Sequence, residues 1–348
     1  MVHTGKETAE FMHGLYAHLG KRTARMLVGP GKGLDNGIVS IGNSKVMIIT
    51  TDPVSAIPGL GVKASARLSV HLIASDYTSS GCDPELAVFA FNFPEEMSRE
   101  DRGDYVAEVG DECGRLGVSI AGGHTGSYPG AGFTVIGSGT MLGFAREDGY
   151  VTPAMADPGD AVLMTKHAAI EATASLALSF PSYTDGRVGA GEGKAARGMI
   201  RRCSTVEDAR AARKVGLGRG GVSSMHDATE GGVLGALEEM SAASSKSFVI
   251  DPAKIRVPKV VEDVCTAFKV DPLTTMGEGS LLITCAPERA EEAAKKLSRS
   301  GIPAAAIGEV AAGAGVWLQP EGGPRTRFKP RPDPYWAAYD RAVARGLA

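Results

Sequence analysis

The spacing of apolar and polar positions predicts alternating strands and helices in the first part of the chain. Apolar residues at helical spacing predict a first helix over 7–27. Apolar runs and amphipathic periodicity then predict elements in the order β-α-β-α-β-β: 45–52, 63–81, 84–94, 98–117, 118–123 and 133–145. This order favours an α+β sandwich over a doubly wound parallel sheet.

A second unit follows a break rich in proline and glycine, TPAMADPGD at 152–160. We therefore expect an N-terminal domain at 1–152 and a C-terminal domain at 158–348. Strands of the second unit are predicted over 161–166, 222–226, 247–251, 279–285 and 303–309. Helices are predicted after Gly232 and over 168–180, 192–201, 205–216, 258–268 and 287–299. The final residues, which include PDPYWAAYDRAVARG, are expected to form an arm and a short helix.

Composition is that of an ordinary globular protein. Of 348 residues, 43% are hydrophobic and 22% are charged, and the formal net charge is -3. This balance predicts no surface for nucleic acid, and no apolar run is long enough to cross a membrane. The five cysteines are scattered without a Cys-x-x-Cys pair, which is typical of a reducing compartment. With a polar N-terminus, these features predict a cytoplasmic protein.

Three aspartates stand at the ends of predicted elements. Asp35 lies in the glycine loop 29–37 before the first predicted strand, Asp52 ends the strand 45–52, and Asp76 lies near the end of the helix 63–81. Carboxylates at such termini point toward the rim where loops converge, and Mg²⁺ prefers one or two carboxylate oxygens together with water and substrate phosphates. The alternative is that each aspartate forms a turn.

Glycine-rich segments contain no complete nucleotide motif. GPGKG at 29–33 and GAGEGKAA at 189–196 lack the glycine spacing of a Walker A loop, and no Ser or Thr follows their lysines. Each is by itself consistent with a plain loop.

A third glycine segment, AGGHTGSYPGAG, joins two predicted strands. Gly122 and Gly123 would let the backbone approach a ligand, and His124 and Thr125 could donate to a phosphate or a substrate oxygen. The alternative is a glycine hairpin with an incidental histidine. The other histidines, including His226, show no metal-ligand spacing and are expected at the surface or in the core.

The stretch SMHDATEGGVLGALEEM places Asp227, Glu230 and two glycines at the start of a predicted helix. A helix N-terminus carries a partial positive charge and can bind anions, yet no lysine lies there. Either this is an ordinary capped helix, or a bound cation supplies the positive charge.

In order along the chain, several motifs together resemble those of the aminoimidazole ribonucleotide (AIR) synthetase-like superfamily. These motifs are LDNGIVSIG, IITTDPV, SVHLIASDYTSSGCDPELAVFAF, SIAGGHTG, PGDAVLMTK, MHDATEGGVLGALEEM, GEGSLLITC and IGEV. The resemblance extends over residues 29–310, and the DATEGG and GEGSLLIT motifs favour the branch of the hydrogenase maturation protein HypE. It implies a two-domain AIR synthase-like fold, with an N-terminal ferredoxin-like α/β sandwich and a C-terminal α/β domain.

The resemblance also implies a homodimer that binds ATP and Mg²⁺ between its domains, together with an unidentified second substrate. The metal ligands would be Asp35, Asp52, Asp76 and Asp227. His124 and Lys32 would take catalytic roles near the phosphates or the acceptor. The other residues expected to contact ATP or the acceptor are Gly31, Gly33, Asn36, Gly122, Gly123, Thr125 and Lys166.

The chain departs from the family pattern at two places. The first motif commonly has two adjacent acids, but Leu34 precedes Asp35, so one metal ligand is missing or replaced. The HypE branch ends in a reactive cysteine, whereas this sequence ends in AVARGLA. We therefore expect a relative that keeps the ATP chemistry but acts on a different acceptor.

Three functions remain open from the sequence. The first is a Mg²⁺-dependent enzyme that uses ATP to phosphorylate an oxygen of an unknown acceptor. The second is a non-catalytic nucleotide-binding maturation or regulatory factor. The third is a structural α+β protein in which the Gly-Asp motifs form only turns.

Overall fold

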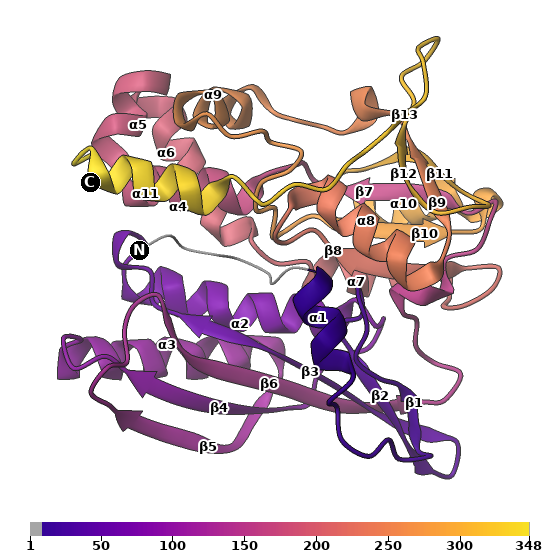
Figure 1. Cartoon of the computed structure of the whole chain (residues 1–348), viewed down its shortest axis with the longest axis horizontal. Coiled ribbons are helices and arrows are strands. Elements are labelled where there is room, and N and C mark those ends of the chain that lie inside the picture. The colour runs from indigo at the N-terminus through magenta and orange to yellow at the C-terminus, as the bar shows by residue number, and fades with distance from the viewer. Residues whose placement is uncertain (1–8, 348) are drawn as a thin grey trace.

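The computed structural model describes residues 9–347, whose strands form two separate sheets, each covered by helices (Figure 1). The first sheet ends with β6 (Val135–Arg146), and the second begins with β7 (Ala161–Thr165). No helix within the described range is long and apolar enough to cross a membrane. The mixed two-domain fold predicted from the sequence is confirmed.

The N-terminal sheet has the strand order β1-β2-β3-β6-β4-β5. Its strands besides β6 are β1 (Met26–Val28), β2 (Gly37–Gly42), β3 (Lys45–Ser55), β4 (Leu86–Phe93) and β5 (Ser119–Ser127). Only β4 and β5 pair in parallel among these neighbours. Two helices, α2 (Val62–Thr78) and α3 (Arg99–Leu116), cover one face of the sheet (Figure 1). Alternate apolar residues of β3 and β4, such as Ile48 and Phe89, form the core beneath α2 and α3.

The C-terminal sheet has the strand order β13-β12-β9-β11-β7-β10-β8. Its strands besides β7 are β8 (Val222–Asp227), β9 (Ser247–Ile250), β10 (Leu281–Cys285), β11 (Ala304–Ala311), β12 (Gly315–Leu318) and β13 (Thr326–Arg327). The helices are α4 (Ile170–Ser179), α5 (Pro181–Val188), α6 (Ala190–Gly198), α7 (Val206–Ala212), α8 (Gly232–Ser244), α9 (Lys259–Phe268), α10 (Ala290–Arg299) and α11 (Tyr335–Ala344). Strand β10, which lies between β7 and β8, is buried along its whole length, which explains its near-continuous apolar character, and the edge strand β8 is buried as well although Ser223, Ser224, His226 and Asp227 are polar.

Three sequence predictions about local structure are wrong. The helix predicted over 7–27 is only α1 (Ala9–Tyr16) in the described part, because Gly20 adopts a left-handed conformation and Met26 pairs with Val39 of β2. Asp52 does not end its strand, since β3 continues to Ser55. The segment that contains His124 is no hairpin loop, because it extends β5 along β4.

The sequence reading also overlooked elements that are too short or too irregular to show periodicity. These are β1, β2, α5, β12 and β13. The segment 189–196, for which a plain loop was the alternative, is mostly helical: it belongs to α6, which begins at Ala190 and overlaps the helix predicted over 192–201.

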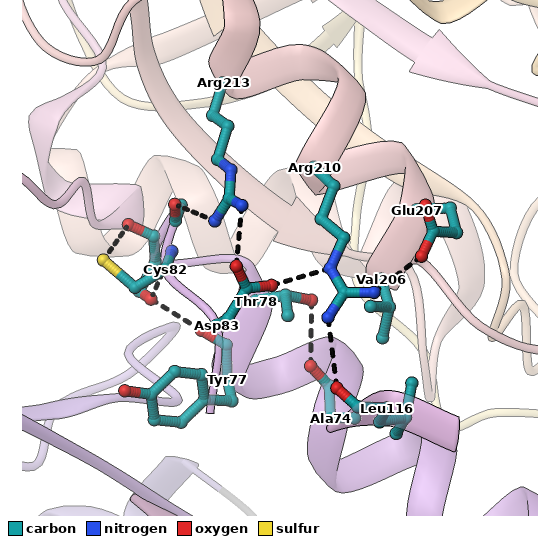
Figure 2. A network of polar contacts seen from close by, with 12 residues as sticks. Ala74, Tyr77, Thr78, Cys82, Asp83, Leu116, Val206, Glu207, Arg210 and Arg213 are labelled. Atoms are coloured by element: carbon teal, nitrogen blue, oxygen red, sulfur yellow. Dashed lines mark hydrogen bonds and ion pairs between the residues drawn. The ribbon is translucent and has the colours of Figure 1, made fainter. Parts of the chain in front are cut away.

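A network of ion pairs fixes one domain against the other (Figure 2). The carboxylate of Asp83, in the loop after α2, accepts from Arg210 Nε at 2.7 Å and from Arg213 Nη2 at 2.6 Å. Arg210 also donates to the carbonyl of Leu116 at the end of α3, and Arg213 donates to that of Gly81. Partial burial opposes ionisation of Asp83, but the two guanidinium groups hold its pKa below the usual value. The arginines lie on and directly after α7, so this network sets how the second domain faces α2.

Candidate metal and nucleotide site

The four aspartates predicted as metal ligands come from separate elements of both domains. Asp35 precedes β2, Asp52 lies within β3, Asp76 is in the last turn of α2, and Asp227 ends β8. Burial, followed by the charges of Asp227, Asp35 and Asp52, raises the pKa of Asp76 well above its usual value. A charge effect of this kind requires the carboxylates to lie close together. The fold therefore gathers all four at the junction of the domains, as the sequence led us to expect.

A histidine lies inside this acidic cluster. His226 Nδ1 is 3.0 Å from Asp35 Oδ2 and 3.5 Å from Asp227 Oδ1, and Nε2 is 3.3 Å from Glu239 Oε2. Burial disfavours the imidazolium, but Asp35 and the other two acids raise the pKa of His226 well above its usual value. Oxygen or nitrogen atoms of Asp35, His226 and Asp227 lie within 4.8 Å of one another, which is a spacing that could hold a metal ion. The sequence analysis placed His226 at the surface or in the core and missed its position in the cluster.

A fifth carboxylate, Glu278, completes the cluster from the C-terminal domain. Its side chain is fully buried, and Ser75 of α2 donates to its Oε1 at 2.7 Å. Burial and the charge of Asp227 raise the pKa of Glu278 well above its usual value. Glu278 lies between Gly277 and Gly279, where an added Cβ would approach the carbonyl oxygens of Ala228 and Arg202 at 2.9 and 2.4 Å. An acid flanked by two glycines directly before a buried strand is the feature of the GEGSLLITC motif that indicates this position in the sequence.

Two carboxylate oxygens in the cluster fit a bound cation. Asp227 Oδ2 and Glu278 Oε2 are buried, and neither has a hydrogen-bond partner within residues 9–347. A buried carboxylate without donors is costly, because the lost hydration is not replaced. Mg²⁺ prefers one or two carboxylate oxygens together with water and substrate phosphates, and these two oxygens can supply the carboxylate part of that set. The residues present therefore fit a divalent cation.

The glycine loop before Asp35 packs against the C-terminal domain. Gly33 has φ +73°, and a Cβ there would lie 2.2 Å from the carbonyl oxygen of Glu239 in α8. Gly31 forms an isolated bridge with Leu34, and the side chain of Lys32 is exposed. The predicted loop residues thus lie next to the cluster. Backbone packing against α8 holds them there.

Two further predicted residues connect elements around the cluster. Asn36 donates to the carbonyl of Asp76 at 2.7 Å, which ties the glycine loop to the end of α2. Lys166 donates to Asp208 and to the carbonyls of Ser204 and Gly279 at 2.7 to 2.8 Å. These three acceptors satisfy the Lys166 ammonium group, so in this structure the residue holds the loop next to Glu278.

The GGHT residues lie away from the acidic cluster. Asp52 pairs with Gly139 of β6, Gly139 with Phe89 of β4, and Phe89 with Gly123 of β5. Gly123 is therefore three strand spacings, about 14 Å, from Asp52 across the sheet. Gly122, His124 and Thr125 are exposed on the edge strand β5, where His124 Nε2 contacts the hydroxyl of Tyr128. Within one chain, the fold does not bring these residues to the predicted metal ligands.

A two-domain α+β protein with an acidic cluster at the domain junction is the class that the fold and the site define. Two family models match the chain: the AIR synthase related protein N-terminal domain over residues 33–145 and the corresponding C-terminal domain over residues 157–319. The chain therefore belongs to the AIR synthase-related family, which confirms the resemblance found in the sequence.

Curated relatives in this family include carbamoyl dehydratase HypE from two bacteria. The protein of Cupriavidus necator is 28% identical over 250 residues, which are 70% of this chain and 66% of that protein. The protein of Rhizobium leguminosarum bv. viciae is 26% identical over 307 residues, 83% of this chain and 82% of that protein.

Solved structures share the fold at low sequence identity. The HypE–HypF complex superposes with a TM-score of 0.73 at 19% identity and covers 93% of this chain and 100% of that one. AaThiL complexed with AMPPCP and TMP has a TM-score of 0.70 at 16% identity, covering 92% and 94%. HypE in complex with ATP has a TM-score of 0.68 at 21% identity, covering 90% and 89%.

Proposed function

We propose that this protein is a Mg²⁺-dependent enzyme that uses ATP to activate an oxygen of a second substrate by phosphoryl transfer. The observation that carries the proposal is the cluster of five carboxylates from both domains, in which buried oxygens of Asp227 and Glu278 have no hydrogen-bond partner among the described residues. The ATP complex of a HypE structure and the AMPPCP complex of AaThiL support nucleotide binding by this fold.

The proposed roles follow from where each residue lies. Asp35, Asp52 and Asp76 would hold magnesium from the N-terminal domain, and Asp227 and Glu278 from the C-terminal domain. When bound, Mg²⁺ neutralises charge on the triphosphate and on the group in transfer. Phosphoryl transfer depends mainly on such neutralisation and on positioning, so the chain needs no covalent nucleophile. The exposed Lys32 lies three residues before Asp35, within reach of a phosphate held there.

A homodimer forms the second part of the proposal. The face of the N-terminal sheet opposite α2 and α3 exposes large apolar side chains of β6, including Val135 and Phe144. Ile136, the neighbour of Val135, is buried in the core, so Val135 points to the opposite, uncovered face. A second copy on this face would cover these side chains and would place the GGHT residues of β5 at the interface. Val135→Asp is expected to yield monomers in light scattering, whereas an unchanged mass would exclude this face.

Released phosphate tests the proposed activity. We expect ATP hydrolysis that requires Mg²⁺ and that falls at least about 100-fold in Asp52→Asn and Asp227→Asn, because one deleted charge-stabilising group typically costs that much. Asp148→Asn is the matched control, since Asp148 is an exposed surface acid paired with Arg146. Full activity in both cluster variants would refute the metal assignment. ATP binding without turnover, in the presence of Mg²⁺ and candidate partners, would instead favour the non-catalytic nucleotide-binding factor.

A further inference from the structure

The C-terminal domain contains an open cleft of about 720 Å³, whose lining includes none of the residues of the acidic cluster. One wall is a face of α6, where Gly191, Lys194, Ala195 and Gly198 recur at helical spacing. Because these residues are small, the space beside this face of α6 stays open: a Cβ added at Gly191 would meet no atom within 4 Å. Sites for small molecules typically have volumes of about 300–1,000 Å³, so the cleft has the size of a metabolite site.

The cleft is strongly cationic. Its lining includes Lys194, Arg201, Arg202 and Arg256, and no acidic side chain among the described residues. None of these four side chains forms an ion pair with any residue that the structure describes, in contrast to Arg210 and Arg213 at the domain junction. Four unpaired cations around one cavity repel one another, and a bound anion would relieve that repulsion.

A buried histidine adds an unsatisfied polar group to this lining. His167 is only 2% exposed, its Nδ1 lies 3.0 Å from the carbonyl oxygen of Ala168, and its Nε2 has no hydrogen-bond partner within residues 9–347. With Nδ1–H donating to Ala168, Nε2 of the neutral ring carries a lone pair, and it becomes a donor to a bound anion when it is protonated. Burial lowers the pKa of His167, as do the charges of Arg202, Arg256 and Lys166. An anion near these arginines would reverse part of that effect.

The backbone that carries His167 is strained and firmly held. Lys166 and Ala169 both have left-handed φ values, 53° and 54°, which are unfavourable for residues other than glycine. The Lys166 ion pair with Asp208 holds one side of this turn, and the hydroxyl of Ser280 donates to the carbonyl of His167 at 2.6 Å. Strain that surrounding contacts maintain is characteristic of functional sites.

We infer that this cleft binds a small multivalent anion, bearing phosphate or carboxylate groups, that is a different molecule from ATP. Magnesium bound with ATP is usually held by one or two protein carboxylates. The described lining of the cleft provides none, whereas the acidic cluster provides five. Ser280, which contacts His167, is two residues from Glu278, so one loop connects the two sites. One part of the inference rests on the proposed function: the assignment of this anion as the acceptor of the phosphoryl group.

Calorimetry of the full chain in the absence of Mg²⁺ tests the site, with pyrophosphate and citrate as probes. Without a cation the acidic cluster repels both probes, which leaves the cleft as their binding site. Arg202→Gln combined with Arg256→Gln is expected to weaken binding at least tenfold, and Ala195→Trp is expected to block it sterically. Arg202, Arg256 and Ala195 are exposed, so both variants should fold. Arg299→Gln, which removes an exposed arginine of α10 outside the cleft, should bind as the unmodified protein does.

Tighter binding of pyrophosphate would assign a phosphorylated ligand, and tighter binding of citrate a carboxylate. Binding that is undetectable at millimolar probe, or equal in the double arginine variant and the unmodified protein, would overturn the inference. Loss of Mg-ATP binding in the arginine variant would also overturn it, because the cleft would then be the nucleotide site. If no ATP hydrolysis is found but the cleft binds the probes as expected, the proposed function fails and the anion site stands.

Discussion

Replacing Asp227 by asparagine should abolish the effect of magnesium on stability while changing the metal-free protein little. Asp227 Oδ1 is 3.5 Å from His226 Nδ1, and its carboxylate lies within 4.8 Å of that of Asp35. At an effective dielectric constant of about 20, these contacts correspond to roughly 5 kcal/mol of attraction and roughly 3 kcal/mol of repulsion. The two nearly cancel, so the substitution should alter the metal-free free energy of unfolding by about 2 kcal/mol or less.

Binding of magnesium should make the Asp227 carboxylate strongly stabilising. At a concentration 100 times its dissociation constant, a ligand specific for the folded state adds about 2.7 kcal/mol to the free energy of unfolding. Thermal unfolding with and without Mg²⁺ should show this gain in the unmodified protein and in Asp148→Asn, but not in Asp227→Asn. An equal magnesium-dependent rise in melting temperature in all three proteins would show that Asp227 is no ligand.

Three further predictions test other parts of the account. Gly33→Ala should destabilise the protein by about 1–3 kcal/mol in denaturant titrations and weaken ATP binding, because its Cβ would lie 2.2 Å from the Glu239 carbonyl oxygen. Gly42→Ala is the control, since Gly42 also has positive φ but open space around it. An equal loss of stability in both variants would exclude the clash. Asp83→Asn should cost about 1–2 kcal/mol, because it weakens contacts with two guanidinium groups that are 26% and 34% exposed; a loss no larger than that of Asp148→Asn would show that the network does not fix the domains. Burial and the charge of Asp333 raise the pKa of Glu171 from 4.5 to about 8, so between these pH values Glu171 keeps a proton in the folded protein that it loses in the unfolded chain. The free energy of unfolding therefore falls as pH rises from 4.5 through 8. Glu171→Gln should remove roughly 3–5 kcal/mol of that fall, and identical pH profiles of the variant and the unmodified protein would contradict the assignment.

Much of the fold was predictable because most of its strands and helices bury one face and expose the other. The helix α3 shows this, since its apolar spacing and its N-cap, Ser98, which accepts from the backbone of Asp101, are both legible in the sequence. Short elements such as α5 and β12 span too few residues to show such periodicity, so the sequence pattern does not indicate them. The apolar pattern also did not predict some turns, such as the one at Gly20.

The acidic cluster was predictable only in part, for a different reason. Asp35, Asp52, Asp76 and Asp227 are in motifs of the family, so the resemblance located them. His226 and Glu278 gain their surroundings from residues far away in the chain: Asp35 faces His226, and Ser75 bonds to Glu278. Lys166 was misleading for the same reason, since Asp208, 42 positions away, occupies the ammonium group that was expected to contact a phosphate.

The location of a bound divalent cation tests the central claim most directly. Crystals grown with Mn²⁺ and a non-hydrolysable ATP analogue would reveal the metal by its anomalous scattering. The proposed metal site predicts an anomalous peak at the domain junction, from a cation bonded to carboxylate oxygens that include those of Asp227 and Glu278, with the triphosphate alongside. A nucleotide bound elsewhere, or a junction without an anomalous peak while the nucleotide is bound, would contradict it.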